Sequence, residues 1–211
     1  MLFLYCNIEM IGVYRTSSEG AEIIYNLLVN EGYSVEWISQ ETVEQGQLSV
    51  YDLVVFPGAH EHVFAFLSSG KFRRMLRRYI LNGGKYVGVC GGAAVGVWAV
   101  KGFSLFEGLK FLKAYLYFLV VGRISFLVVW NTDNMFGKVG LQEMAWAGGP
   151  PIELDGFKVE ALFAESKPFV PYKDKPAIAS GKHGDGCLVL FSPHPEYRED
   201  TLNLILRALN G

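Results

Sequence analysis

The stretch KYVGVCGGAA, residues 85–94, decides the fold. It is typical of a buried strand, Tyr86 to Val89, that runs directly into Cys90 and then into a helix of small residues. A nucleophile on such a sharp strand-to-helix turn sits in a strained backbone conformation, and its neighbours must lack side chains so that helix and strand can approach. The segment therefore predicts a nucleophile elbow with cysteine in the place of serine.

Cys90 would lie at the N-terminus of that helix, beside free backbone N–H groups and the positive end of the helix dipole. Both favour the thiolate form over the thiol. The N–H of Gly91 is then a candidate donor to a developing oxyanion. The alternative is that Cys90 is only a small buried hydrophobic residue, as most cysteines are.

A second informative segment, VLFSPHPE, covers residues 189–196. An apolar strand delivers His194 and Glu196 just beyond its end, and Pro195 stiffens the backbone between them. We expect His194 to take the thiol proton and Glu196 to hold the imidazole tautomer.

The third segment, Phe56-Pro-Gly-Ala59, follows another buried strand. Ligands of open α/β sheets bind beyond the carboxyl ends of the strands, and all three segments begin at such ends. The backbone N–H groups of Gly58 and Ala59 are candidates for the second oxyanion donor, although a plain Pro–Gly turn is the alternative.

Outward from these segments, strands and helices alternate. Helical spacing covers Glu19 to Asn30, Lys71 to Leu81 and the region from Gly91 to Val100, and the closing helix runs from Thr201 to Leu209. Strands are predicted at 2–8, 33–38, 52–56, 86–89, 176–180 and 187–191, with Asp185–Gly186 as the turn between the last two. This alternation predicts an α/β fold with a doubly wound, mostly parallel sheet.

Between Phe103 and Phe163 the pattern changes to strand-like runs, which we interpret as a β-rich insertion. Phe111 to Trp130 is about as long as a membrane span, but Lys113 and Arg123 make insertion expensive. We predict two strands with a turn near Gly122 instead, and no contact with a membrane.

The 211 residues suit a single domain, 1–211, with 51% hydrophobic and 19% charged residues that predict a sizeable core. The net charge is −2, and basic and acidic residues are mixed along the chain. This argues against a nucleic-acid-binding protein, which would need a basic face or tail. Cys6, Cys90 and Cys187 form neither a disulfide framework nor a zinc motif. Reduced thiols fit a cytoplasmic protein.

Pro57–Gly58, Gly88-Val-Cys90-Gly-Gly92 and His194-Pro-Glu196 resemble, in order, the motifs of class I glutamine amidotransferase domains. The elbow from Gly83 to Ala93 and the loop from Trp146 to Pro150 are most similar to the biotin–protein ligase N-terminal-domain family. The resemblance implies a flavodoxin-like fold, with Cys90 as nucleophile, His194 as base and Glu196 as orienting acid. It implies no cofactor.

One position departs from the superfamily pattern. Glutamine-hydrolysing members carry Gly-x-Cys-x-Gly-x-Gln, and Ala94 occupies the last position here. We therefore expect free glutamine to be a poor substrate, and the smaller Ala94 to leave room for a bulkier group. The leading hypothesis is an enzyme that attacks an amide or related acyl bond of a small molecule through a Cys90 thioester. The alternative is a regulatory, ligand-binding member with a redox-sensitive Cys90. A homo-oligomer or an unidentified partner protein is compatible with both.

Further residues are candidates for substrate binding. His60 follows the Pro57–Gly58 turn with Glu61 and His62, and the three would form a polar pocket rim rather than a metal site, because alternate residues of an extended chain face opposite ways. Glu143, Trp146, Gly148 and Gly149 would line the pocket, although Glu143 and Trp146 could instead cover the sheet.

Overall fold

The computed structural model describes residues 8–209, and its strands form one mixed sheet. One half is parallel, in the order β2 (Ser34–Ile38), β1 (Met10–Tyr14), β3 (Leu53–Phe56), β4 (Lys85–Val89) and β9 (Gly186–Phe191). The other half is antiparallel, and continues from β9 through β8 (Pro176–His183), β7 (Lys158–Phe163), β5 (Ile124–Trp130) and β6 (Leu141–Trp146). β9 is therefore shared by both halves.

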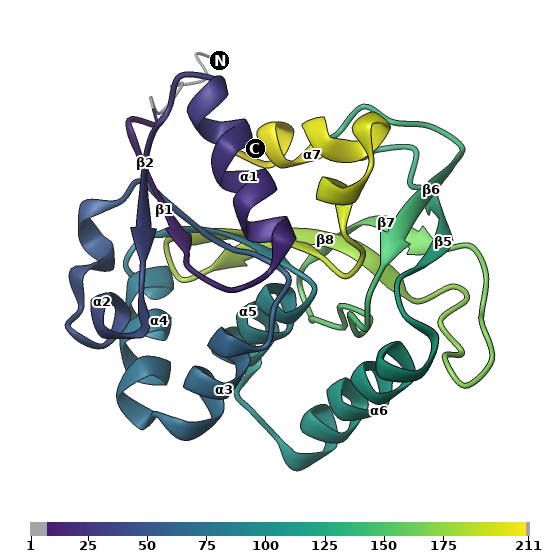
Figure 1. Ribbon diagram of the computed structural model, residues 1–211, viewed down its shortest axis with the longest axis horizontal. Helices are drawn as coiled ribbons and strands as arrows, with labels where there is room; N and C mark the ends of the chain where they lie inside the picture. The colour runs from purple at the N-terminus through teal and green to yellow at the C-terminus, as the bar shows by residue number, and fades with distance from the viewer. Residues whose placement is uncertain (1–7, 210–211) are drawn as a thin grey trace.

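Helices cover both faces of the sheet (Figure 1). On one face lie α1 (Glu19–Asn30) and α7 (Glu199–Leu209). On the other lie α3 (Glu61–Ser68), α4 (Gly70–Leu81), α5 (Gly91–Lys101) and α6 (Leu105–Val121). The short helix α2 (Gln40–Glu44) and the single turns η1 (Gln47–Val50) and η2 (Pro195–Tyr197) complete the described elements. Each face of the sheet carries its own apolar core cluster, as a three-layer α/β architecture requires.

Local sequence explains where these elements begin. Ser18 caps α1 by accepting a hydrogen bond from the N–H of Ala21 at 3.3 Å. The four residues of β3 are all buried, as expected for a parallel strand covered on both faces. A turn joins β8 and β9 as an antiparallel pair, as predicted, but it is formed by Gly184 and Asp185, one residue earlier than expected.

The predicted α/β fold is confirmed, but the sheet is mixed rather than mostly parallel. The strands after α6 are joined without crossover helices, and such connections pair strands antiparallel. The N-terminal half does have the predicted alternation of strand and helix. The first strand is β1 at Met10–Tyr14, whereas residues 2–7 of the strand expected at 2–8 lie outside the described residues.

The prediction of two strands between Phe111 and Trp130 was also wrong. Residues Leu105–Val121 form α6, and only Ile124–Trp130 form a strand. Ser104 caps the helix, since its Oγ accepts a hydrogen bond from the N–H of Glu107 at 3.3 Å. Within residues 8–209, no helix combines the length and the hydrophobicity that a membrane crossing needs.

Candidate active site

Cys90 lies on the turn between β4 and α5, at the carboxyl edge of the parallel strands. Its backbone has φ 51° and ψ −107°, a region that residues with a side chain rarely adopt. The turn is held on both sides: the Cys90 N–H donates to Phe191 O at 2.7 Å, and the Ala94 N–H donates to Cys90 O at 3.0 Å. The geometry is that of the nucleophile elbow predicted from the sequence.

The glycines after Cys90 allow the close approach of neighbouring backbone. A Cβ added to Gly92 would lie 2.0 Å from Phe56 O, and a Cβ added to Gly91 would lie 2.0 Å from Ala59 O. Any larger residue at either position would therefore displace backbone. The same contact brings Gly91 against the segment that contains Gly58 and Ala59, so the three predicted oxyanion-hole residues lie together beside Cys90.

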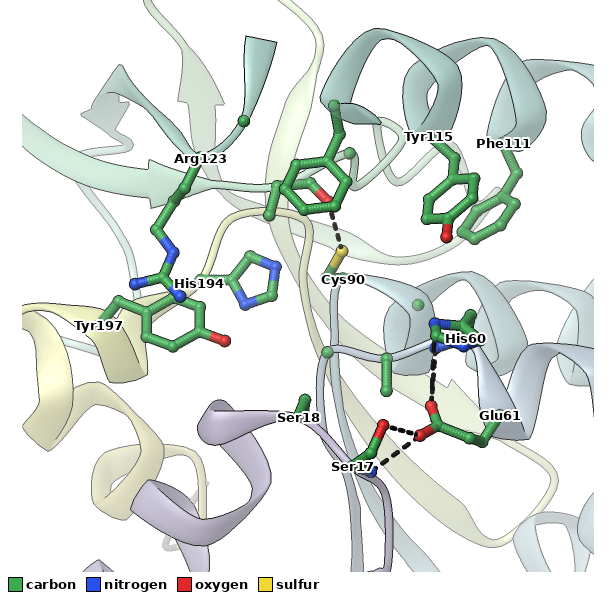
Figure 2. A pocket seen from close by; sticks show the side chains of 17 residues that line it. Ser17, Ser18, His60, Glu61, Cys90, Phe111, Tyr115, Arg123, His194 and Tyr197 are labelled. Carbon is green, nitrogen blue, oxygen red and sulfur yellow. Dashed lines mark hydrogen bonds and ion pairs between the residues drawn. The ribbon is translucent and has the colours of Figure 1, made fainter. Parts of the chain in front are cut away.

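His194 and Glu196 follow β9 and contact one another. His194 Nδ1 and Glu196 Oε1 are 2.7 Å apart, and both residues are buried. The N–H of His194 donates to Ala145 O at 2.8 Å, which ties the histidine to the end of β6. The imidazole lies beside Cys90 in the same pocket (Figure 2).

The other ring nitrogen, His194 Nε2, is buried and has no hydrogen-bond partner among the described residues. The Cys90 thiol instead donates to Ala147 O at 3.6 Å. Burial alone lowers the pKa of His194, but the charges of Glu196 and Cys90 outweigh burial and raise that pKa above its ordinary value.

Gly58 makes room for this imidazole. A Cβ on Gly58 would lie 2.1 Å from His194 Cε1 and 2.8 Å from Nδ1. The Pro57–Gly58 segment is therefore not a plain Pro–Gly turn, because Gly58 packs directly against the imidazole of His194.

The loop between β6 and β7 borders the site from the other side. Trp146 is fully buried, and its Nε1 donates to Gly149 O at 2.8 Å. Ser192 Oγ donates to the same carbonyl at 3.0 Å. These bonds fix the segment that presents Ala147 and Gly148 to Cys90.

A cavity of about 490 Å³ opens above Cys90. Of the residues predicted to bind substrate, His60 and Gly148 line this cavity, whereas Glu143, Trp146 and Gly149 do not. Glu143 forms an ion pair with Arg198 at 3.1 Å instead. Ala94 is buried and lies outside the cavity, so the expectation that its small side chain enlarges the pocket was wrong.

The predicted extended conformation of residues 60–62 was also wrong, because α3 begins at Glu61. His62 points into the core, where it is fully buried among Tyr14 and Phe56, and only His60 and Glu61 reach the cavity. Within residues 8–209 no group of three or more histidine, cysteine, aspartate or glutamate residues is arranged to hold a metal ion.

One wall of the cavity is aromatic and was missed by the sequence analysis. Phe111, Tyr115 and Phe118 of α6 form it, and the rings of Phe111 and Tyr115 are stacked with centroids 6.2 Å apart. Their spacing of four and three residues is helical, a signal that was available in the sequence but hidden by the strand prediction.

The opposite wall is polar and was also missed. Ser17 donates to Glu61 Oε1 through its N–H at 2.8 Å and its Oγ at 2.6 Å. Burial opposes the ionisation of Glu61, but these bonds outweigh burial and lower its pKa to about 2. Arg123 lies over the ring of Tyr197, 3.4 Å from its centroid (Figure 2). Arg123 also forms an ion pair with Glu19 at 3.2 Å, so Glu61 and Arg123 both line the cavity with their side chains already held by protein contacts.

The signal for Ser17 and Ser18 was their position after the first parallel strand, where the rule that ligands bind at strand carboxyl ends applies. Arg123 gave no such signal, because it is distant in sequence from the other site residues.

The fold resembles that of glutamine amidotransferase-like domains. The family model described as "Biotin-protein ligase, N terminal" matches residues 11–104, a stretch that contains β1, β3, β4 and the Cys90 elbow. The resemblance to this family is thereby confirmed over that stretch. No curated protein sequence matches the chain.

Solved structures share the fold. A Thermoplasma acidophilum protein named as a candidate GMP synthase component has a TM-score of 0.62 and 16% identity, with 97% of this chain and 94% of that chain covered. A ThuA-like protein from Bacteroides uniformis has a TM-score of 0.57 and 16% identity, with 96% and 89% covered. β-Galactosidase from Bacillus circulans sp. alkalophilus has a TM-score of 0.58 and 16% identity, with 96% of this chain but only 31% of that chain covered. At these identities the likeness concerns the fold.

Proposed function

We propose that the protein hydrolyses an amide or related acyl bond of a small molecule through a thioester on Cys90. The observation that carries the proposal is the state of His194: Nδ1 is bonded to buried Glu196 at 2.7 Å, while Nε2 is buried without a partner among the described residues, in the cavity that holds Cys90. A histidine oriented on one side and free on the other is what a base for a thiol nucleophile requires.

In the first half-reaction His194 takes the proton of the Cys90 thiol, the sulfur attacks the substrate carbonyl, and an S–C bond forms. The backbone N–H groups near Gly58, Ala59 and Gly91 are the proposed donors to the oxyanion. As the C–N bond breaks, His194 gives its proton to the departing nitrogen, which leaves as ammonia or an amine. In the second half-reaction His194 takes a proton from water, the hydroxide attacks the thioester, the C–S bond breaks, and His194 returns the proton to the sulfur. The sum is hydrolysis of the amide to an acid and an amine.

The walls of the cavity favour a substrate with both an apolar and a charged part. Phe111, Tyr115 and Phe118 offer aromatic surface, whereas Glu61 and Arg123 offer opposite charges. A cavity of about 490 Å³ has the size of a small-molecule site. Because the superfamily glutamine is replaced by Ala94, we expect at most slow ammonia release from free glutamine.

The test is intact-protein mass spectrometry after incubation with a panel of amide and activated-ester probes. The expected result is one acyl adduct on Cys90 that is absent from Cys90→Ala and present in the control Cys187→Ala. His194→Gln should slow adduct formation by about 10²–10⁴-fold, the usual contribution of a general base. Equal adducts on Cys90 and Cys187 in the folded protein would contradict the proposal. Oxidation of Cys90 without acylation would favour the regulatory alternative.

A further inference from the structure

The outer face of α6 carries a regular row of leucines. Their spacing alternates between four and three residues, which is the hydrophobic repeat of a coiled coil. We call them the leucine row: Leu105, Leu109, Leu112, Leu116 and Leu119. Each exposes about half or more of its surface, from 48% at Leu112 to 76% at Leu105.

Two further apolar side chains flank the leucine row on one side. Phe106 is 65% exposed and Val120 is 84% exposed. Soluble monomers rarely expose a contiguous apolar surface of this size. The solvent-facing side of a helix is normally polar, so a row of leucines with coiled-coil spacing indicates a contact surface.

The inner face of the same helix is fixed to the rest of the molecule. Ala114 is buried, and Phe111, Tyr115 and Phe118 line the active-site cavity. The leucine row therefore points away from the core that its helix covers, and it is not the face of α6 used for folding.

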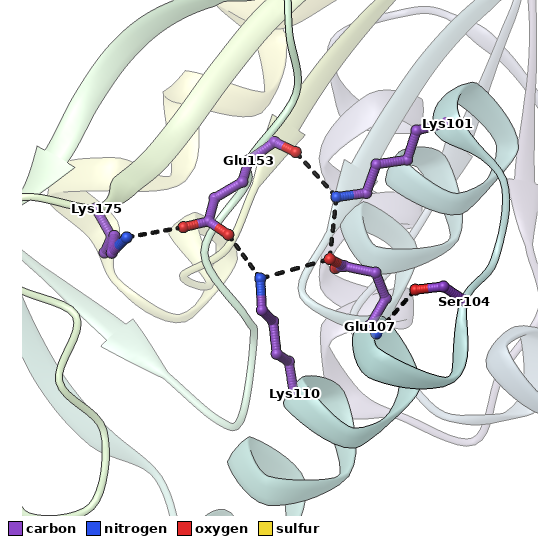
Figure 3. A network of polar contacts seen from close by, with 6 residues as sticks. All are labelled: Lys101, Ser104, Glu107, Lys110, Glu153 and Lys175. Atoms are coloured by element: carbon purple, nitrogen blue, oxygen red, sulfur yellow. Dashed lines mark hydrogen bonds and ion pairs between the residues drawn. The ribbon is translucent and has the colours of Figure 1, made fainter.

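A network of charges anchors the first half of α6 (Figure 3). Lys110 contacts Glu153 at 2.7 Å and Glu107 at 3.4 Å, while Lys101 contacts Glu107 at 3.2 Å. Lys175 contacts the other oxygen of Glu153 at 3.0 Å. These ion pairs hold α6 in place, so the leucine row lies on a fixed helix.

We propose that the leucine row is the interface through which two copies of this chain pair. Covering the leucine row, Phe106 and Val120 completely would remove at most about 800 Å² from water on each copy, and about 800 Å² per partner is typical of a stable interface of standard size. The row is self-complementary, since leucine side chains of one helix fit between those of an identical helix, as a two-fold symmetric dimer requires.

The charges around α6 favour a second copy of this chain, rather than a lipid surface, as the partner of the leucine row. A helix that lies on an anionic membrane carries free lysines and arginines along its polar face. Here Lys101, Lys110 and Lys175 have carboxylate partners, and among the lysines near α6 only Lys113 has no ion pair within the described residues.

The proposal is tested by sedimentation velocity across a micromolar concentration series, which measures mass and is independent of any catalytic activity. The wild type should form dimers. Leu112→Glu and Leu116→Glu should each weaken dimerisation at least about tenfold, because a charge would be buried in the centre of the interface. Val50→Glu is the control, since Val50 is 61% exposed on η1, outside α6.

Circular dichroism checks that each variant is folded, and Leu112→Ser replaces any glutamate variant that is not. A wild type that remains monomeric throughout the series would overturn the proposal. So would leucine-row variants that dimerise as tightly as Val50→Glu. Flotation of a monomeric wild type with phosphatidylcholine–phosphatidylglycerol vesicles, lost in Leu112→Glu, would overturn it in favour of a lipid surface.

Discussion

At the scale of single residues, the contact between Gly58 and His194 is the most sensitive point of the candidate site. The space that a Gly58 side chain would occupy is taken by the imidazole, with Cε1 2.1 Å and Nδ1 2.8 Å from the position of a Cβ. The overlap is hard to relieve, because the ring is held by Glu196 and the backbone of His194 is held by the Ala145 carbonyl.

Gly58→Ala should therefore displace the imidazole and lengthen its 2.7 Å contact with Glu196. The pKa of His194, measured by NMR titration, should fall towards its ordinary value because the raising effect of Glu196 weakens. Acylation of Cys90 should slow by about tenfold or more, since the base is misplaced. Gly70→Ala is the matched control, because a Cβ there meets only the flexible ends of Arg74 and Arg73 at 3.4 and 3.6 Å. An unchanged titration in Gly58→Ala would show that the ring is not constrained by this glycine.

At the scale of elements, α6 lines the cavity with one face and carries the exposed leucine row on the other. Its strand-like composition, rich in Phe, Tyr, Leu and Val, favoured a β prediction. Helical order is favoured instead by Ser104, three residues before Glu107, which is the sequence pattern of a helix N-terminus. Anchoring to Glu153 then holds the first turns of the helix against the loop after β6.

Glu153→Gln should loosen that anchor. The carboxylate contacts Lys110 and Lys175, and the hydrogen bond from Lys110 is the main reason why its pKa is lowered. We expect hydrogen exchange in residues 105–121 to become several-fold faster, with a loss of no more than about 1 kcal/mol in global stability, because these pairs are partly exposed.

The control for this change is Asp133→Asn, which removes an ion pair to Lys158 from an aspartate that is 97% exposed on the loop between β5 and β6. If exchange in residues 105–121 were the same in both variants, Glu153 would not be the anchor of the helix.

At the scale of the whole molecule, the buried His62 links stability to pH. Both of its ring nitrogens lack hydrogen-bond partners among the described residues, and burial lowers its pKa from 6.5 to about 3. Between pH 6.5 and about pH 3, His62 is protonated in the unfolded chain but neutral in the native state. Stability is therefore lost as the pH falls from about 6.5 towards about 3.

Replacing His62 by Phe, among the rings of Tyr14 and Phe56, should remove this dependence. Urea unfolding at pH 7.5 and pH 5 should show that the wild type loses roughly 2 kcal/mol more than His62→Phe over that interval. The opposite contribution of His194, whose raised pKa stabilises the native state at low pH, is present in both proteins and cancels in the comparison. His60→Asn, at an exposed position, should keep the wild-type slope, and an equal slope in His62→Phe would contradict the assignment.

The sequence by itself determined the features that depend on neighbouring residues. The strand and glycines around Cys90, the helix over Glu19–Asn30 and the turn between β8 and β9 all follow from local propensity and close backbone packing. The pairing of His194 with Glu196 was predictable for the same reason, because two residues separated by a proline have few relative orientations.

Only the tertiary structure decided which distant segments share the cavity. Arg123 reaches Tyr197, and Ser17 reaches Glu61, through contacts between elements whose separation along the chain says nothing about distance in space. The mixed sheet and the helical state of Leu105–Val121 were likewise settled by packing, since an apolar run of that kind satisfies strand and helix equally until it meets the surface that it covers.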